Sequence, residues 1–186
     1  MGMPDVAKYW TRAEVLALPD DGHRYELVDG ELLVSPAPRY LHQRAVAEFY
    51  RRLHDYVARH GLGEALFSPS DLDLRAEQLV QPDLFVVAPA AGRAAEWADV
   101  GIPRLVVEVL SPSTARYDRV TKRRRYQRSG IPTYWVVDLD ARLVEVWNPD
   151  AISPTIADVS LEWRPEPAVA GLVIDLAACF ETIWNP

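Results

Sequence analysis

Residues 80–87 read VQPDLFVV and residues 105–114 read LVVEVLSPST, and these two stretches decide the fold. Their apolar runs show no polar alternation, which is typical of strands covered on both faces of a sheet. Each run carries one carboxylate, because Asp83 lies at the start of the first run and Glu108 lies in the middle of the second. We therefore expect two buried strands, each with an acidic residue.

An ionised carboxylate inside such a strand is costly unless a metal, a cation or a dense set of hydrogen bonds compensates its burial. If the two strands are neighbours and both side chains share a face, directly opposed Cβ atoms lie about 4.5 to 5.5 Å apart. One Mg²⁺, with Mg–O bonds of about 2.0 to 2.1 Å, could then bridge Asp83 and Glu108. The pair therefore predicts a metal site for phosphodiester chemistry.

Each acid also has a plain structural explanation. Pro82 and Asp83 could simply open a strand or turn, since proline is tolerated at the first position of a strand and aspartate favours turns. Glu108 could form a structural ion pair with Arg104 or with an arginine of the following helix. The residues alone leave both alternatives open.

A basic helix follows the second strand. Asp118 is interpreted as its N-cap or first-turn acid, and Gly130 followed by Pro132 closes it. Asp118, Lys122 and Tyr126 share one face at i, i+4 spacing, with Tyr126 expected to pack rather than react. Lys8 and Lys122 are the only lysines beside eighteen arginines. A compact ammonium could hold the attacking water or the phosphate, so Lys122 is a candidate catalytic residue.

The charge of the chain supports a polyanion partner at this helix only. Residues 116–128 hold seven basic residues and one acid, a local balance of +6, which leaves −13 for the remainder of a chain whose net charge is −7. Affinity for nucleic acid scales with the number of phosphates neutralised, so binding over the whole surface is not expected. The candidate DNA-binding residues are Arg119, Arg123, Arg125 and Arg128. A solvated helix face or an intersubunit set of salt bridges is the alternative.

Several motifs occur in an order that resembles the Uma-type endonuclease family, a branch of the PD-(D/E)XK restriction-endonuclease-like superfamily. The resemblance covers roughly residues 20–150 and rests on YELVDGELLVSPAP (25–38), LHQ (41–43), VQPDLFVV (80–87), LVVEVLSPST (105–114) and DRVTKRRRYQRSGIPTYWVVD (118–138).

The resemblance implies an α/β (α+β) fold with a restriction-endonuclease-like core, in which a central mixed β-sheet is flanked by helices and preceded by an N-terminal hairpin. It implies Mg²⁺-dependent cleavage of DNA, with Mn²⁺ as a substitute, and metal ligation by Asp83 and Glu108. The superfamily's usual lysine two residues after the acid is absent, because that position is Leu110, and the family pattern moves it to Lys122. Glu26 matches a further motif position and is a candidate catalytic residue, as a further carboxylate at the site, although a role in a hairpin turning at Asp29 and Gly30 explains it equally well.

Length and composition predict one domain spanning residues 1–186, in which residues 151–186 pack back on the motif core. The single cysteine, Cys179, rules out an intrachain disulfide and suits a reducing cytoplasm. No stretch has the roughly 18 apolar residues of a membrane span, and residues 1–10 lack a signal pattern. A cytoplasmic protein is therefore expected.

The remaining elements follow from local patterns. Thr11 and Glu14 predict a capped short helix, residues 25–34 a hairpin, and residues 41–56 an amphipathic helix stopped by Gly61. His42, at the start of that helix, resembles a family position but is interpreted as a cap or surface residue. Further strands are expected over residues 65–74, with Asp71 and Asp73 facing solvent, and in a hairpin over 134–147; the proline-rich residues 149–167 are expected to be extended or looped.

Three functions fit the sequence. The first is a Mg²⁺-dependent DNA endonuclease in which the backbone carbonyl of Val109 completes the metal shell, acting as a homodimer because cutting both strands of a duplex commonly requires two sites. The second is a catalytically inactive or accessory nucleic-acid-binding protein of the same fold. The third is a metal-independent glycosidase using the two acids, which ranks last because no aromatic sugar platform is visible.

Overall fold

The computed structural model describes residues 8–72, 74, 79–89 and 100–185. A six-stranded sheet forms its centre, in the order β3-β4-β5-β6-β7-β8. Its strands are β3 (Glu64–Phe67), β4 (Leu84–Val87), β5 (Leu105–Val109), β6 (Tyr134–Asp138), β7 (Leu143–Trp147) and β8 (Thr155–Ala157). Only β5 and β6 run parallel, so the sheet is mixed, as expected.

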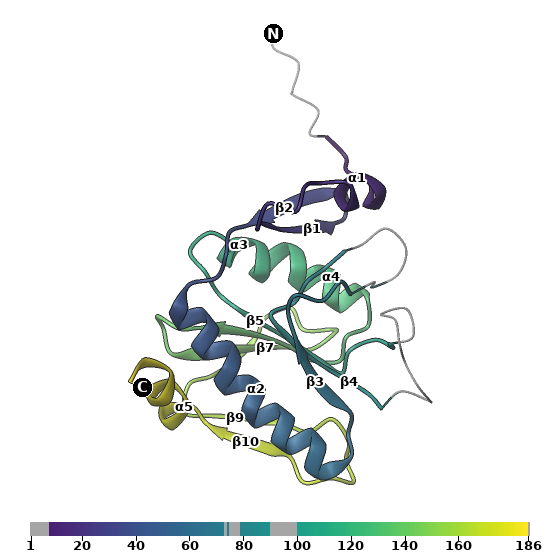
Figure 1. Ribbon diagram of the computed structural model, residues 1–186. Coiled ribbons are helices and arrows are strands. Elements are labelled where there is room, and N and C mark those ends of the chain that lie inside the picture. Colours follow the sequence, from purple (N-terminus) through teal and green to yellow (C-terminus); the bar gives the residue numbers. More distant parts are fainter. Residues whose placement is uncertain (1–7, 73, 75–78, 90–99, 186) are drawn as a thin grey trace.

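Helix α2 (Tyr40–His60) lies along one face of this sheet (Figure 1). Its apolar side buries Ala45, Phe49 and Leu53 against alternate residues of β4 and β5, and Gly61 ends it with a positive φ of 62°. Residues at C′ that adopt this left-handed conformation are usually glycine, because a Cβ is unfavourable there. The predicted helix and its stop are confirmed.

The C-terminal segment packs on the same side. Strands β9 (Ser160–Trp163) and β10 (Leu172–Asp175) form a separate two-stranded sheet, and α5 (Leu176–Trp184) contacts α2. Leu161, Ile174 and Phe180 belong to the same core cluster as α2.

A second helical segment covers the opposite face of the sheet (Figure 1). It runs without a break through α3 (Ala115–Tyr117), a π-helical turn η2 (Asp118–Lys122) and α4 (Arg123–Arg128). Tyr126 packs there with Val106 and Phe85. The wider π turn lies where Asp118 and Lys122 are buried, and such turns are frequent at functional sites.

The N-terminal region forms a small layer next to α3 and α4 (Figure 1). Helix α1 (Arg12–Leu16) has the predicted capping box between Thr11 and Glu14, and β1 (Arg24–Val28) pairs with β2 (Glu31–Ser35) in the predicted hairpin. Positive φ angles at Asp29 and Gly30 form the turn. Among the described residues the hairpin belongs to no larger sheet, and Leu27 forms an isolated bridge with Leu79.

Two strand boundaries are predicted wrongly. The strand expected over residues 65–74 ends at Phe67, and the one expected from residue 80 begins at Leu84, since Leu72 and Val80 form only an isolated bridge. The proline-rich residues 149–167 are extended over β8 and β9, as expected. Asp118 is not the N-cap, because the helix begins at Ala115 after Thr114, but it is an acid in the first turn of η2. Asp73 lies outside the described residues.

Candidate active site

Asp83 and Glu108 meet at the start of β4. The antiparallel register pairs Leu84 with Val107, so one step further places Asp83 opposite Glu108. The backbone N–H of Asp83 donates to Glu108 Oε2 over 3.3 Å, and the N–H of Val109 donates to Asp83 Oδ2 over 2.9 Å. The two acids are therefore linked by the strand pairing itself, as their apolar surroundings predicted.

Two basic side chains from distant segments bind the Asp83 carboxylate. Arg24 of β1 donates from Nη1 to Oδ1 over 2.9 Å, and His42 of α2 contacts Oδ2 through Nε2 over 3.0 Å. Burial alone would raise the pKa of Asp83, but the hydrogen bond and charge of His42, together with the charges of Arg24 and Lys122, lower it well below its usual value. Asp83 is therefore held as an anion.

Glu108 has the opposite electrostatic balance. Its Oε1 accepts from Lys122 Nζ and from the Tyr126 hydroxyl, each over 2.9 Å. Burial raises the pKa of Glu108 well above its usual value. The charge of Lys122 opposes this rise, whereas the charges of the nearby carboxylates, above all Asp83, add to it. Glu108 and Asp83 thus differ sharply in proton affinity within one site.

Lys122 lies at the centre of a buried acidic cluster. Its Nζ is 2.9 Å from Glu108 Oε1, 3.0 Å from Glu26 Oε1 and 3.5 Å from Asp118 Oδ1. Its side chain is 1% exposed. Burial lowers the pKa of Lys122, but the three carboxylates outweigh burial and raise it well above its usual value. Lys122 is therefore a permanently charged partner of Glu108.

Glu26 enters the cluster from the hairpin and is fully buried. One oxygen, Oε1, accepts from the backbone N–H of Gln81 over 2.9 Å and contacts Lys122. The other oxygen, Oε2, accepts no hydrogen bond from a described residue, and neither does Asp118 Oδ1. Each is close to a cation, since Arg24 Nε lies 3.8 Å from Glu26 Oε2 and Lys122 Nζ lies 3.5 Å from Asp118 Oδ1.

The charge balance of the cluster fits a divalent cation. Glu26, Asp83, Glu108 and Asp118 are four buried acids, whereas Arg24 and Lys122 supply two positive charges, so the net charge is −2 when all are ionised and His42 is neutral. Carboxylate oxygens are the ligands that Mg²⁺ prefers. The Arg24 guanidinium already occupies Asp83 Oδ1 as a cation would. Within the part of the chain that the structure describes, no group of three or more His, Cys, Asp or Glu residues forms a ready-made metal site.

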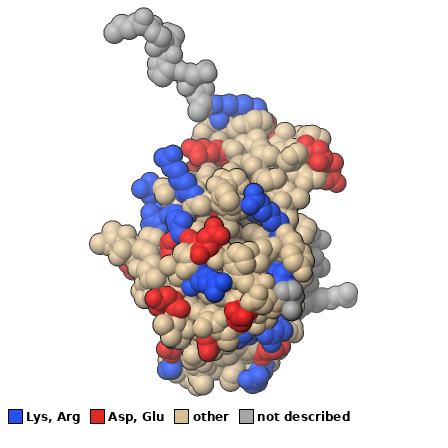
Figure 2. Space-filling view, turned by 90° about the vertical axis from the view of Figure 1, so that its left-hand side faces the viewer, with Lys and Arg blue, Asp and Glu red and all other residues tan. Residues whose placement is uncertain are grey.

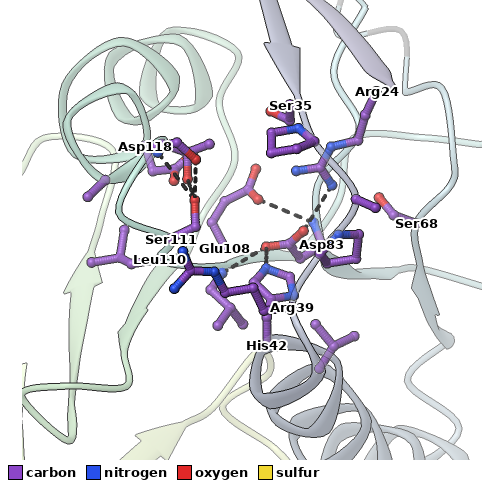
Figure 3. A pocket seen from close by; sticks show the side chains of 18 of the residues that line it. Arg24, Ser35, Arg39, His42, Ser68, Asp83, Glu108, Leu110, Ser111 and Asp118 are labelled. Carbon is purple, nitrogen blue, oxygen red and sulfur yellow. Dashed lines mark hydrogen bonds and ion pairs between the residues drawn. The ribbon is translucent and has the colours of Figure 1, made fainter. Parts of the chain in front are cut away.

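A cavity of about 1070 Å³ opens beside the two acids. Figure 3 shows Arg24, Arg39 and His42 around Asp83, with Ser111 and Asp118 on the other side of the cavity. Asp83, Glu108, Val109 and Asp118 all line it, whereas Lys122 and Glu26 lie behind Glu108 and are not among the described lining residues. A substrate in this cavity would therefore meet Asp83 and Glu108 directly.

The basic helix is largely engaged within the molecule. Arg119 pairs with Asp138 and Glu145 at 2.8 and 2.6 Å, and the Arg123 guanidinium lies 4.6 Å from the centre of a Trp147 ring. Arg125 donates to the Leu74 carbonyl, and Arg128 lies 3.5 Å from Asp29.

Figure 2 shows basic and acidic side chains intermixed over most of the face that it presents, with one group of basic side chains at the upper left. Of the four candidate arginines, Arg119 alone lines the cavity among the described residues. The DNA-binding role of all four stays a prediction.

Two interpretations of single residues are corrected by these contacts. His42 is neither a cap nor a surface residue, because its side chain is 12% exposed and bound to Asp83. The arginine partners suggested for Glu108 are also wrong, since Arg104 pairs with Glu166 and the cation at Glu108 is Lys122. The sequence patterns do not identify Arg24 and Tyr126 as site residues. For Arg24 one local signal of its position exists, because it stands two residues before Glu26 and so lies on the same face of the strand as Glu26.

The mixed sheet, the flanking helices and the buried acid pair define the class of restriction-endonuclease-like proteins. The chain belongs to the Uma2 family, described as "Putative restriction endonuclease", whose model matches residues 12–177. A similar solved structure is described as a "putative nuclease belonging to DUF820" from Anabaena variabilis ATCC 29413. It is 19% identical, with a TM-score of 0.73 over 94% of this chain and 99% of that chain, and so shows the shared fold. No curated protein matches the sequence.

None of the helices that the structure describes is both long and apolar enough to cross a membrane.

Proposed function

We propose that this protein is a Mg²⁺-dependent endonuclease that hydrolyses phosphodiester bonds of DNA. The observation that supports this function best is the buried, opposed pair Asp83 and Glu108 at the wall of the cavity, within a cluster of four buried carboxyl groups. A site of this kind fits a hard divalent cation. Membership of a family described as "Putative restriction endonuclease" makes the phosphodiester bond the expected substrate.

Asp83, Glu108 and the backbone carbonyl of Val109 would hold the cation, with Mn²⁺ as a substitute for Mg²⁺. When bound, the cation would polarise the phosphoryl oxygen and lower the pKa of a water molecule. The protein's own contribution is to position these ligands. Arg24 and His42 fix the orientation of the Asp83 carboxylate, and the N–H of Val109 fixes it relative to β5.

Lys122 and Tyr126 hold Glu108 in a comparable way. Both donate to Glu108 Oε1, which leaves Oε2 directed to the side of Asp83. In the geometry observed, Lys122 is a positioning residue for Glu108, and Glu26 and Asp118 in turn hold Lys122. A direct contact of Lys122 with the attacking water or the phosphate would require its Nζ to leave these carboxylates.

The test is incubation of supercoiled plasmid with the protein in Mg²⁺, Mn²⁺ or EDTA. We expect cation-dependent cleavage that is lost in Asp83→Asn, because the amide keeps the shape of the carboxylate and removes its charge. Asp140→Asn is the matched control, since Asp140 also lines the cavity but is exposed and outside the acid pair. Folding of each variant is checked by circular dichroism. Cleavage that survives in Asp83→Asn would refute the assignment.

The products also report on assembly. A homodimer with two sites would cut both strands and yield linear plasmid, whereas a single site would yield nicked circles.

A second candidate function is nucleic-acid binding without cleavage. It is favoured by one observation, namely that both oxygens of Asp83 are already paired with Arg24 and His42. Salt-sensitive DNA binding without nicking in Mg²⁺ or Mn²⁺ would support it over the nuclease.

A further inference from the structure

The cavity beside Asp83 is lined by three arginines, and two of them are already committed. Arg24 is bound to Asp83, and Arg119 is bound to Asp138 and Glu145. The third, Arg39, makes no side-chain hydrogen bond or ion pair with any described residue, although it is exposed and lines the cavity. Its guanidinium is therefore available to a ligand in the cavity.

Arg39 also occupies a position where arginine does not stabilise the fold. It is the N-cap of α2, and it forms no side-chain capping hydrogen bond. Serine, threonine, aspartate and asparagine are preferred at an N-cap because their oxygens accept from the free N–H groups of the first turn. A positive charge is also unfavourable at this end of the helix dipole. The local structure thus gains nothing from Arg39, which points to a role outside folding.

The charges on the two sides of the cavity are complementary to a phosphodiester strand beside a cation site. The acids Glu108, Asp118, Asp138 and Asp140 come from β5, η2, the end of β6 and the turn that follows it, together with Arg119, which is paired with Asp138. The basic residues His23, Arg24, Arg39 and His42 come from the N-terminal segment and the start of α2, next to Asp83, which Arg24 and His42 bind. Asp20 is the one acid among the described lining residues of the N-terminal segment. The start of the 21-residue helix α2 adds its positive dipole end to that side.

We propose that Arg39 binds a backbone phosphate of the nucleic-acid strand that enters this cavity, next to the bond cleaved at Asp83 and Glu108. This inference rests on the proposed function and makes it more specific. It assigns strand binding to the N-terminal side of the cavity, and not to α4, because Arg123, Arg125 and Arg128 are engaged elsewhere and are not among the described lining residues. A guanidinium suits the task because it can donate two parallel hydrogen bonds to one phosphate.

The test is fluorescence anisotropy with short fluorescein-labelled single-stranded and duplex DNA, in EDTA and in Ca²⁺, over a series of salt concentrations. Arg39→Ala is compared with Arg59→Ala. Arg59 is an exposed arginine at the opposite end of the same helix, about 30 Å away at 1.5 Å per residue. Arg39→Lys keeps the positive charge and removes the planar guanidinium that can donate two parallel hydrogen bonds.

Arg39→Ala is expected to weaken DNA binding by about tenfold. It should also reduce the slope of log K against log salt by about 0.7 for the single strand or about 0.9 for the duplex, the value of one phosphate contact. Arg39→Lys should keep most of the salt slope and lose part of the affinity, and Arg59→Ala should match the wild type. Equal binding by Arg39→Ala and Arg59→Ala would overturn the inference, and so would a wild-type protein that binds neither DNA.

Cleavage of plasmid by the same variants separates this inference from the proposed function. If Arg39→Ala binds DNA more weakly but the wild type does not cleave it, the phosphate site is supported and the nuclease function is refuted. If the wild type cleaves DNA, and Arg39→Ala binds and cleaves it equally well, the nuclease function is supported and the phosphate site is refuted.

Discussion

Replacing Lys122 with methionine tests whether the buried acidic cluster depends on one ammonium group. The substitution keeps the length of the side chain and removes a charge that lies within 3.5 Å of Glu26, Glu108 and Asp118. The net charge of the cluster then changes from −2 to −3. Breaking a buried ion pair by removing one partner costs about 3 to 5 kcal/mol, because the other charge stays buried and uncompensated.

A loss of this size is a large share of the stability of a typical domain, which is about 5 to 15 kcal/mol. For a chain of this length each kcal/mol corresponds to roughly 2 to 4 °C in Tm, so we expect Tm to fall by about 6 to 20 °C. The assay is urea unfolding in EDTA, followed by the fluorescence of buried tryptophans such as Trp135. Lys8→Met is the matched control, since the only other lysine is 55% exposed and pairs with Glu14 at the surface. It should unfold like the wild type.

The loss of stability should depend on pH in a defined direction. Burial already raises the pKa of Glu108 and Asp118, and Lys122 is the charge that opposes this rise for both. Without Lys122 both carboxyl groups bind protons more tightly in the folded than in the unfolded state, so stability is lost as pH rises. The difference from wild type should thus be larger at about pH 8 than at about pH 5.

Two results would refute this reasoning. One is a loss below about 1 kcal/mol at the higher pH, which is the range of a surface pair. The other is a loss that does not change with pH. A double variant, Lys122→Met with Glu108→Gln, should recover part of the stability, because it removes one of the uncompensated charges.

Two further predictions concern metal binding and the core. Burial raises the pKa of Glu108, so a cation must compete with a proton for this carboxylate. The affinity for Mn²⁺, measured by calorimetry, should therefore increase with pH and be lost in Asp83→Asn. An affinity that is independent of pH would contradict the assignment of Glu108 as a ligand. Burial also raises the pKa of Cys179 to about 11. At about pH 8 its thiol should therefore react with a disulfide reagent only when urea unfolds the protein. Rapid labelling of the native protein would contradict the burial of Cys179 in the core.

The elements that sequence patterns predict well are those with strong local signals. Helix α2 has an apolar stripe over many turns and a glycine stop, and β5 has five consecutive buried residues. Strands β8 and β9 have only three and four residues and lie among prolines, so they are defined by pairing with the adjacent strands β7 and β10 and not by local preference. The strand at residues 65–74 was predicted too long for the same reason, since pairing with β4 ends at Phe67.

The site shows the same division between local and distant signals. Asp83 and Glu108 are candidates because a carboxylate in an apolar run is a local anomaly, and Lys122 because it is one of two lysines beside eighteen arginines. Arg24 and His42 stand 59 and 41 residues from Asp83 in the sequence, and no local pattern predicts the contact of either residue with Asp83. Only the packing of the hairpin and of α2 against β4 brings them together.

The stability of the fold does not explain why the chain buries so many charges around Lys122. Replacing a buried ion pair by apolar residues of similar size is often neutral or stabilising, because desolvation consumes most of the Coulombic gain. Here Glu26 Oε2 and Asp118 Oδ1 accept no hydrogen bond from a described residue and have only the longer ion pairs with Arg24 and Lys122, of 3.8 and 3.5 Å. The cluster also makes the docking of the hairpin depend on Glu26, which reaches Lys122 from outside the central sheet. A site that weakens the fold in this way, at the wall of a large cavity, is better explained by binding a cation than by packing.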